Sequence, residues 1–188
     1  MLVGFGLTNL TLYDFGTVDP HNLANQIFRQ KHIGMPKVDA LAKMLAEINP
    51  EIILKPAKDG YSGQRLSGYV FLSVDNIELR REIATSNKDN PHIKAMFDFR
   101  TRLTDAQHYA ADWSNLKMVG DFLRSMAFSH NKAVAETPVS ACNVTLSVAP
   151  TVRMICALGV MNFINFVRGG ELKKFVQIDT SSFVLDAF

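Results

Sequence analysis

The sequence predicts an α/β fold, with a mostly parallel sheet flanked by helices and an antiparallel hairpin at the C-terminal end. Strand-like apolar runs alternate with helical patterns over roughly the first hundred residues, which is typical of parallel βαβ units. The last two strand-like runs are separated by a short turn signal, which favours a hairpin. With 188 residues and 47% hydrophobic side chains, the chain is long enough for a sizeable core, and we expect a single domain over residues 1–188.

The first half of the chain alternates between strand and helix patterns. Residues 7–14 are rich in β-branched and aromatic side chains and close on a turn signal at Gly16. Apolar side chains at 38, 41, 45 and 48 have helical spacing, and Asn49-Pro50 ends that helix. Apolar runs predict strands at 51–56, 69–74 and 94–99. A helix is expected over 75–87, with Asp75 or Asn76 as its cap.

The second half predicts one more strand, two helices and the hairpin. We expect the strand at 107–113, an amphipathic helix at 114–126 and an irregular crossover segment at 128–147. The apolar residues 149–167 predict a buried core helix, stopped by Gly169-Gly170. Its longest apolar stretch, 154–167, is shorter than the about 20 residues that a membrane span needs. Residues 172–179 and 182–188 form the hairpin around Thr180-Ser181.

Composition excludes several classes of function. A formal net charge of +2 is too small to favour nucleic acid or a membrane as the main partner. The two cysteines, Cys142 and Cys156, exclude a disulfide framework and a four-cysteine zinc site. The scattered histidines predict no structural metal. Because residues 1–12 lack a basic signal-peptide region, we expect a cytoplasmic protein.

Three charged residues lie where an α/β sheet binds ligands. Asp14 and Asp75 each end a predicted strand, and Lys37 begins a predicted helix. Ligands of open α/β sheets bind at the carboxyl ends of the strands, so these three side chains are expected to converge. An acid accepts hydrogen bonds from a ribose, a lysine at a helix start neutralises a phosphate, and a second acid holds Mg²⁺. Taken singly, each acid also suits a helix cap and the lysine a solvated surface.

The sequence around these residues resembles that of one family. "LTLYDFGTVDPHNLANQ", "GMPKVDALAKMLAEINPEI" and "VFLSVDNIELRREI" follow the order and spacing of the ThiF/MoeB/HesA family, the adenylyltransferases related to ubiquitin-activating enzymes. That pattern has an L-T-L-x-D strand end, an N-L-x-R-Q segment, a G-x-x-K turn, I-N-P, and an apolar strand that ends in D-N, here Asp75-Asn76. The match is tight over residues 4–83 and loose over 84–188.

The resemblance implies a Rossmann-like domain that binds ATP and Mg²⁺ and uses no zinc. The C-terminal carboxylate of a small ubiquitin-like protein, or of a peptide, attacks the α-phosphorus and forms an acyl-adenylate. Asp14 would be the ribose ligand, and Lys37 would contact the phosphates. Asp75 would hold Mg²⁺, and the remaining nucleotide-binding positions would be Asn22, Asn25, Gln26 and Asn76. Such chemistry depends on positioning and charge stabilisation.

The chain also departs from the family pattern. Gly16 replaces a second acid, and Asn25 stands where the pattern has an arginine that binds phosphate, although Arg29 lies one helical turn further on. The family's first strand and glycine-rich loop are missing, because Gly4 and Gly6 precede a strand instead of following one. We therefore expect a version of the fold that is truncated at its N-terminal end, and a truncated or impaired enzyme.

Alternatives to an intact enzyme remain open. A non-catalytic binding or dimerisation module would also explain Gly16 and Asn25, whereas another Rossmann enzyme, such as a dehydrogenase, would not explain Lys37. Cys142 is either an acceptor of the activated partner or a small buried hydrophobe, and Cys156 belongs to the core. An ion pair is expected between Asp98 and Arg100. Apolar surface left uncovered by the missing strand and helix predicts a homodimer.

Overall fold

The structure, a computed structural model, describes residues 1–128 and 148–188. These residues form two compact units, Met1–Gln64 and Arg65–Phe188, which are described separately. Each unit begins with a strand and a later helix that the sequence predicts. These are the strand and helix within residues 7–48 in the first unit and within residues 68–87 in the second. The predicted single domain stays a prediction.

The first unit is built on one parallel strand pair. Strand β1 (Asn9–Tyr13) pairs with β2 (Ile53–Ala57) over five residues, and helix α2 (Lys37–Ile48) lies between them in the chain. Parallel strands need such a crossover because a tight turn cannot join them. Between β1 and α2 the chain forms the short helix α1 (Asn22–Asn25) and the 3-10 turn η2 (Gln30–His32). A first 3-10 turn, η1, covers Leu2–Phe5 and ends at Gly6, whose φ of 93° suits glycine.

The second unit contains a five-stranded sheet in the order β3-β4-β5-β6-β7. Its strands are β3 (Gly68–Leu72), β4 (Ile93–Thr101), β5 (Asp105–Asp112), β6 (Phe175–Asp179) and β7 (Val184–Ala187). Strands β3 and β4 are parallel, and the remaining three pairs are antiparallel. The predicted C-terminal hairpin is therefore confirmed, and antiparallel pairing also includes β5.

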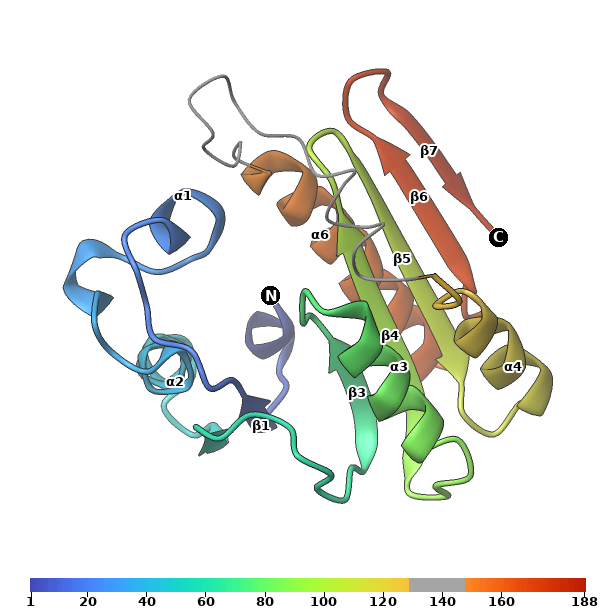
Figure 1. Cartoon of the computed structure of the whole chain (residues 1–188), viewed down its shortest axis with the longest axis horizontal. Helices are drawn as coiled ribbons and strands as arrows, with labels where there is room; N and C mark the ends of the chain where they lie inside the picture. Colours follow the sequence, from blue (N-terminus) through green and yellow to red (C-terminus); the bar gives the residue numbers. More distant parts are fainter. Residues whose placement is uncertain (129–147) are drawn as a thin grey trace. The chain divides into compact units, whose positions relative to one another are not determined.

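Helices cover both faces of this sheet (Figure 1). Helix α3 (Ile77–Ser86) and α4 (Leu116–Arg124) lie on one face, and α6 (Ala149–Val167) lies on the other. On the α6 side the core includes Ala106, Ile155, Val176 and Ile178, with Phe99 and Leu158 packed against them. Neighbouring positions along β4 therefore face different helices, with Phe97 and Phe99 toward α6 and Asp98 toward α3.

Helix α6 confirms the predicted helix over 149–167 but is buried on one face only. Ile155, Gly159 and Phe163 face the sheet, whereas Met154 and Met161 are each almost half exposed. Its 19 residues and mean hydropathy of 1.4 would also suit a membrane span, and a third of this apolar window is buried inside the protein. The helix thus has an apolar outer face in addition to the face that packs on the sheet.

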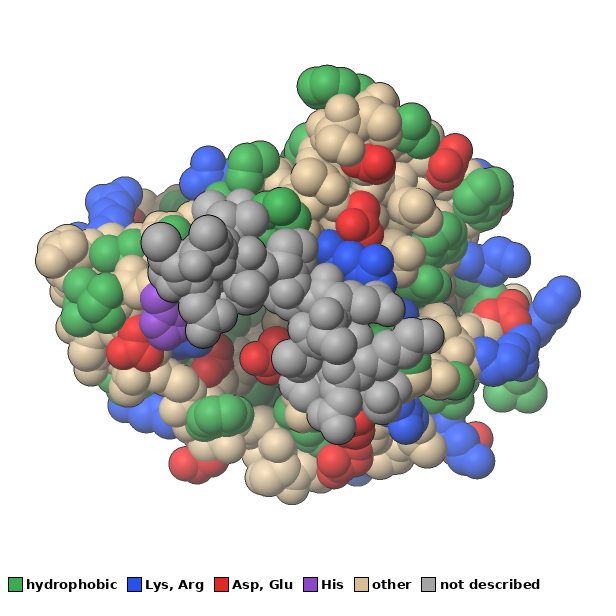
Figure 2. All heavy atoms as spheres, turned by 45° about the horizontal axis from the view of Figure 1, so that its top comes forward, with side chains coloured by type: hydrophobic (Ala, Val, Ile, Leu, Met, Phe, Trp, Pro, Cys, Tyr) green, Lys and Arg blue, Asp and Glu red, His purple; other side chains and the backbone are tan. Residues whose placement is uncertain are grey.

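Charged side chains of both signs are present on the surface seen in Figure 2. Figure 2 shows acidic and basic side chains interspersed on the face that it displays. This mixture agrees with the formal net charge of +2.

Candidate functional site

Asp14 lies directly after β1 and holds the loop that follows it. Its Oδ1 accepts a hydrogen bond from the Gly16 N–H at 2.7 Å, and its own N–H donates to the Ala57 carbonyl at 3.2 Å. An acid that binds the backbone two residues on forms a tight local turn. Among the described residues none donates to Oδ2. The half-buried carboxylate therefore has one oxygen committed to the loop, while its second oxygen accepts from no described residue.

Lys37 and Asp14 meet at Gly16. The Lys37 N–H donates to the Gly16 carbonyl at 2.9 Å, which ties the start of α2 to this loop. A Cβ placed on Gly16 would lie 3.0 Å from Asp14 Oδ1 and 3.3 Å from Lys37 Nζ. The structure thus brings the predicted ribose ligand and the predicted phosphate ligand together. It also shows that a side chain at position 16, where the family pattern has an acid, would be crowded by both.

The polar residues of α1 have partly structural roles. Asn22 is buried, and its Oδ1 accepts from the Asp19 N–H at 2.9 Å. Gln26 ends α1, where its N–H donates to the Asn22 carbonyl at 2.8 Å, and its side chain is exposed. Asn25 is half-buried, and the Arg29 side chain is exposed. The phosphate roles of Asn22, Asn25 and Gln26 stay predictions, with the Asn22 oxygen already committed to the fold.

Asp75 and Asn76 follow β3 in the second unit, and the structure shows which of them caps α3. Asn76 is the cap of α3, because its Oδ1 accepts from the Leu79 N–H at 2.9 Å. Asp75 is exposed, so its carboxylate is available to a cation. The use of Asn76 as a nucleotide ligand stays a prediction, but its oxygen already serves the helix.

A buried charged cluster next to this turn was only half expected. Asp98 is fully buried, and Arg100 Nε donates to its Oδ2 at 2.7 Å, which confirms the predicted ion pair. The sequence analysis missed Arg80, whose Nη1 donates to the other carboxylate oxygen. A signal for it existed, since Arg80 has helical spacing from Ile77 and Ile83 and so lies on the buried face of α3. An arginine on a buried helix face needs a partner.

His108 forms a second buried polar group, on the α6 side of the sheet. It stacks against Phe97 and Phe99, its Nδ1 lies 3.2 Å from the Asp98 carbonyl, and its Nε2 lies 3.2 Å from the Asn162 amide nitrogen. A carbonyl can only accept, so Nδ1 carries the proton and Nε2 accepts. Burial lowers the pKa of His108 from 6.5 to about 4.

Of the two cysteines, the structure describes Cys156. Cys142 lies outside the described residues. Cys156 is a free, half-buried thiol on α6, and burial raises its pKa, so the unreactive thiol form is favoured there. Within residues 1–128 and 148–188, no three His, Cys, Asp or Glu side chains lie close enough to hold a metal ion.

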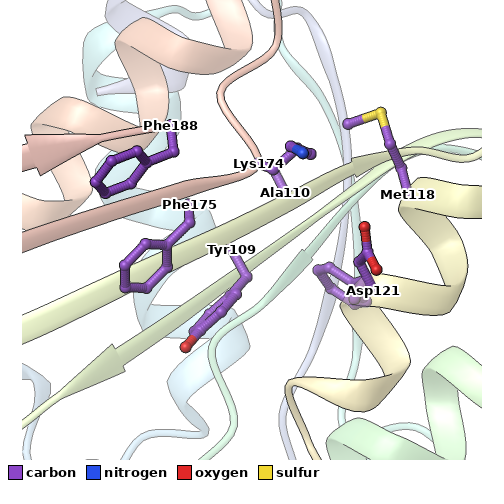
Figure 3. Close-up of a pocket in the computed structure, with 8 residues that line it drawn as sticks. Tyr109, Ala110, Met118, Asp121, Lys174, Phe175 and Phe188 are labelled. Carbon is purple, nitrogen blue, oxygen red and sulfur yellow. The ribbon is translucent and has the colours of Figure 1, made fainter.

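An open pocket of about 240 Å³ lies between α4 and strands β5 and β6 (Figure 3). Tyr109 and Phe175 form its aromatic wall, with ring centroids 4.9 Å apart, and the Phe188 ring stacks on Phe175. Asp121 and Lys174 are its charged lining residues. The residues that the sequence predicts for a nucleotide site do not line it, so this pocket is a separate feature of the second unit.

Comparison with known proteins identifies the family. Residues 1–187 match the ThiF family. The chain belongs to this family. The predicted resemblance is confirmed, and the match covers both compact units of this ThiF-family chain.

Curated relatives of this ThiF-family chain match part of its length. The ubiquitin-like modifier-activating enzyme 5 of Arabidopsis thaliana is 33% identical over an aligned length of 108 residues, and the match covers 44% of this chain and 24% of that protein. The molybdopterin-synthase adenylyltransferase of Salmonella typhimurium is 34% identical over an aligned length of 89 residues, and the match covers 44% of this chain and 36% of that protein. The matched regions thus span about a quarter to a third of these relatives.

Solved structures confirm the α/β fold of the family. Escherichia coli MccB, solved with ATP, has a TM-score of 0.71 at 13% identity. The match covers 100% of this chain and 57% of the MccB chain. A PaaA structure has a TM-score of 0.69 at 14% identity, and the match covers 96% of this chain and 55% of the PaaA chain. At these identities the likeness shows the fold alone.

Proposed function

We propose that this chain is part of an ATP-dependent adenylyltransferase that activates the C-terminal carboxylate of a small ubiquitin-like protein or peptide. Membership of the ThiF family and relatives named as a modifier-activating enzyme and an adenylyltransferase support this proposal. The observation that carries it is the meeting of the Asp14 carboxylate and the Lys37 ammonium group around Gly16. A hydrogen-bond acceptor beside a cation at a helix start suits a ribose and the phosphate attached to it.

In the proposed reaction the chain's residues bind, orient and neutralise. A carboxylate oxygen of the substrate attacks the α-phosphorus of ATP, the bond to the β-phosphate oxygen breaks, and pyrophosphate leaves with both electrons of that bond. Asp14 Oδ2 accepts hydrogen bonds from the ribose. Lys37 Nζ balances the negative charge that develops at phosphate oxygens, and the dipole of α2 adds to this field.

Asp75 fits a magnesium ion that arrives with the nucleotide. Mg²⁺ is commonly held by one or two carboxylates together with substrate phosphates and water, so one exposed acid at a strand end is sufficient. When bound, the ion neutralises phosphate charge and orients the leaving pyrophosphate. Asp75 is proposed as its single protein ligand.

A non-catalytic ThiF-like module is the second candidate. Asn25 supplies no charge where the family pattern has an arginine, and the Asn22 oxygen is committed to the Asp19 N–H. Both observations reduce what the α1 region can offer a phosphate. This candidate keeps the fold and a partner surface but binds no ATP.

Calorimetric titration of the chain with ATP and Mg²⁺ separates the two candidates. We expect binding, and a loss of affinity of at least about tenfold in Asp14→Ala and in Lys37→Ala, because each variant removes one direct polar contact. Asp59→Ala and Lys43→Ala, which remove exposed charges of the same sign in the same unit, are the matched controls and should bind as the unchanged chain does. Absence of binding at millimolar ATP would contradict the enzyme and favour the module.

A further inference from the structure

The turn that carries Asp75 is held on both sides. On one side, the Val74 carbonyl accepts a hydrogen bond from Arg80 Nε at 2.5 Å. On the other side, Asn76 caps α3 through the Leu79 N–H, and its carbonyl accepts from the Arg80 N–H at 3.2 Å. The backbone on either side of Asp75 is therefore fixed, while the Asp75 side chain itself remains exposed.

Arg80 is in turn oriented by the neighbouring strand. Its Nη1 donates to Asp98 Oδ1 and, at 2.6 Å, to the Phe99 carbonyl, both on β4. With Nε on the Val74 carbonyl, one planar guanidinium links the segment that follows β3 to β4, whose Asp98 is in register with Leu72. These two strands are parallel neighbours, so both of their carboxyl ends lie at the same edge of the sheet (Figure 1).

Asp98 is held in place by a second arginine. Arg100 Nε binds the other carboxylate oxygen, and its remaining nitrogens donate to the Ser125 carbonyl at 2.8 Å and the Ser125 hydroxyl at 2.9 Å. The Arg100 guanidinium also lies over the Tyr109 ring, 4.2 Å from its centroid. Asp98 therefore cannot turn away from Arg80 without breaking its bond to Arg100, which is itself anchored at Ser125 and Tyr109.

Such a cluster is a costly way to stabilise a fold. Buried ion pairs are often no more stabilising than well-packed apolar side chains of the same volume, because both charges lose their hydration. A guanidinium instead supplies several donors in a fixed plane, which sets the relative position of the groups that it joins. Here the joined groups are β4 and the residue immediately before Asp75.

We infer that Arg80, oriented by Asp98, is a positioning residue that holds the Val74–Asn76 turn so that Asp75 faces the cation of Mg·ATP. This inference rests on the proposed function, because it assigns the supporting partner of the proposed magnesium ligand. Partners that orient a metal ligand commonly change metal affinity by about tenfold to a hundredfold when they are replaced.

The test uses Arg80→Lys, which keeps the charge and loses the planar fork. The affinity for ATP is measured by calorimetry with Mg²⁺ and with a chelator, and we expect the gain that Mg²⁺ provides to shrink by about tenfold while metal-free binding is unchanged. Arg81→Lys is the matched control on the same helix, since Arg81 donates to the Met126 and Phe128 carbonyls and not to the turn. Its response to Mg²⁺ should equal that of the unchanged chain.

Hydrogen exchange gives a readout that needs no nucleotide. The amide of Leu79, which donates to Asn76 Oδ1 of this turn, should exchange about tenfold faster in Arg80→Lys than in the unchanged chain, and no faster in Arg81→Lys. If Arg80→Lys does not fold, Arg80→Met leaves the neutral Asp98–Arg100 pair in place and is expected to behave in the same way.

The outcomes separate this inference from the proposed function. A folded Arg80 variant with normal exchange at the turn, or with an undiminished gain from Mg²⁺, overturns the inference. Absence of ATP binding by the unchanged chain overturns the proposed function and the cation role with it. Faster exchange in the Arg80 variants together with a reduced gain from Mg²⁺ supports both.

Discussion

His108 shows how buried partners select one charge state of a residue. Its Nε2 faces the amide group of Asn162, whose nitrogen also donates to the Lys173 carbonyl at 2.8 Å. A proton on Nε2 would meet that donor, and burial between aromatic rings removes the water that would solvate the charge. Both effects favour the neutral ring and agree with a pKa near 4.

This pKa predicts acid sensitivity of the fold. Below pH 6.5 His108 is protonated in the unfolded chain but not in the folded chain, so unfolding takes up a proton. The free energy of unfolding therefore decreases as the pH is lowered. The loss continues to about pH 4, where both states are protonated, and amounts to about 3 kcal/mol. Urea unfolding of His108→Gln should lack this slope between pH 6.5 and 4, and His21→Gln, an exposed control, should keep it. An equal slope in all three proteins would contradict the assignment.

At single residues, sequence patterns identified functional candidates better than they identified partners. The spacing around Asp14, Lys37 and Asp75 was enough to nominate them, and the expected Asp98–Arg100 pair is local in sequence. Arg80 was missed because its partners are on β4, eighteen and nineteen residues away. The commitment of the Asn22 oxygen depends on loop geometry that composition does not show.

Among the elements, α6 depends on a glycine for its approach to the sheet. A Cβ on Gly159 would lie 2.2 Å from Phe99 Cε1 and 3.3 Å from His108 Cε1, which the packed rings cannot accommodate without moving. Small-to-large changes in a packed core typically cost about 1–3 kcal/mol. The side of α6 that faces β4 and β5 therefore tolerates no side chain at this position.

Two glycine variants test this contact. Gly159→Ala should lower the free energy of unfolding by about 1–3 kcal/mol in urea denaturation. Gly120→Ala, in the middle of α4, should raise it by about 0.5–1 kcal/mol, because the new Cβ would lie 3.5 Å from the flexible end of Arg124 and alanine favours the helix. Changes in the same direction would contradict the packing described for α6.

Strand direction was the weakest part of the element predictions. The strand expected at 94–99 extends to Thr101, and only three residues separate it from β5 at Asp105. The Arg102 N–H donates to the Asp105 carbonyl at 2.8 Å and closes this turn. Such a short connection cannot cross over, so β4 and β5 must be antiparallel. The direction of β5 therefore follows from the position where β4 ends and β5 begins, and not from the apolar pattern of the two strands.

For the whole molecule, the predicted homodimer stays a prediction, and the sheet edge supports it. Strand β7 lies at the end of the five-stranded sheet and is exposed along its length, including Val184 and Leu185. Exposed apolar edge strands tend to pair with another strand, and a second copy presents the same edge.

Light scattering tests the dimer directly. We expect a particle of about twice the 20.9 kDa of one chain, because pairing of two β7 edges satisfies their free backbone groups. Leu185→Lys should shift the mass toward one chain, since a charged edge opposes pairing, whereas Lys94→Ala, at an exposed position on β4, should not. A monodisperse monomer of the unchanged chain would refute the prediction.

By itself, the sequence determined the order and type of the longer elements and the family, and it nominated residues for a nucleotide site, whose roles stay predictions. These follow from local periodicity, turn chemistry and motif spacing, which are properties of short segments. Only the tertiary structure decided that Arg80 joins the Asp75 turn to Asp98, that Asn76 rather than Asp75 caps α3, and that His108 is neutral. Each of these depends on burial and on contacts between side chains and backbone groups in three dimensions, which segment patterns do not encode.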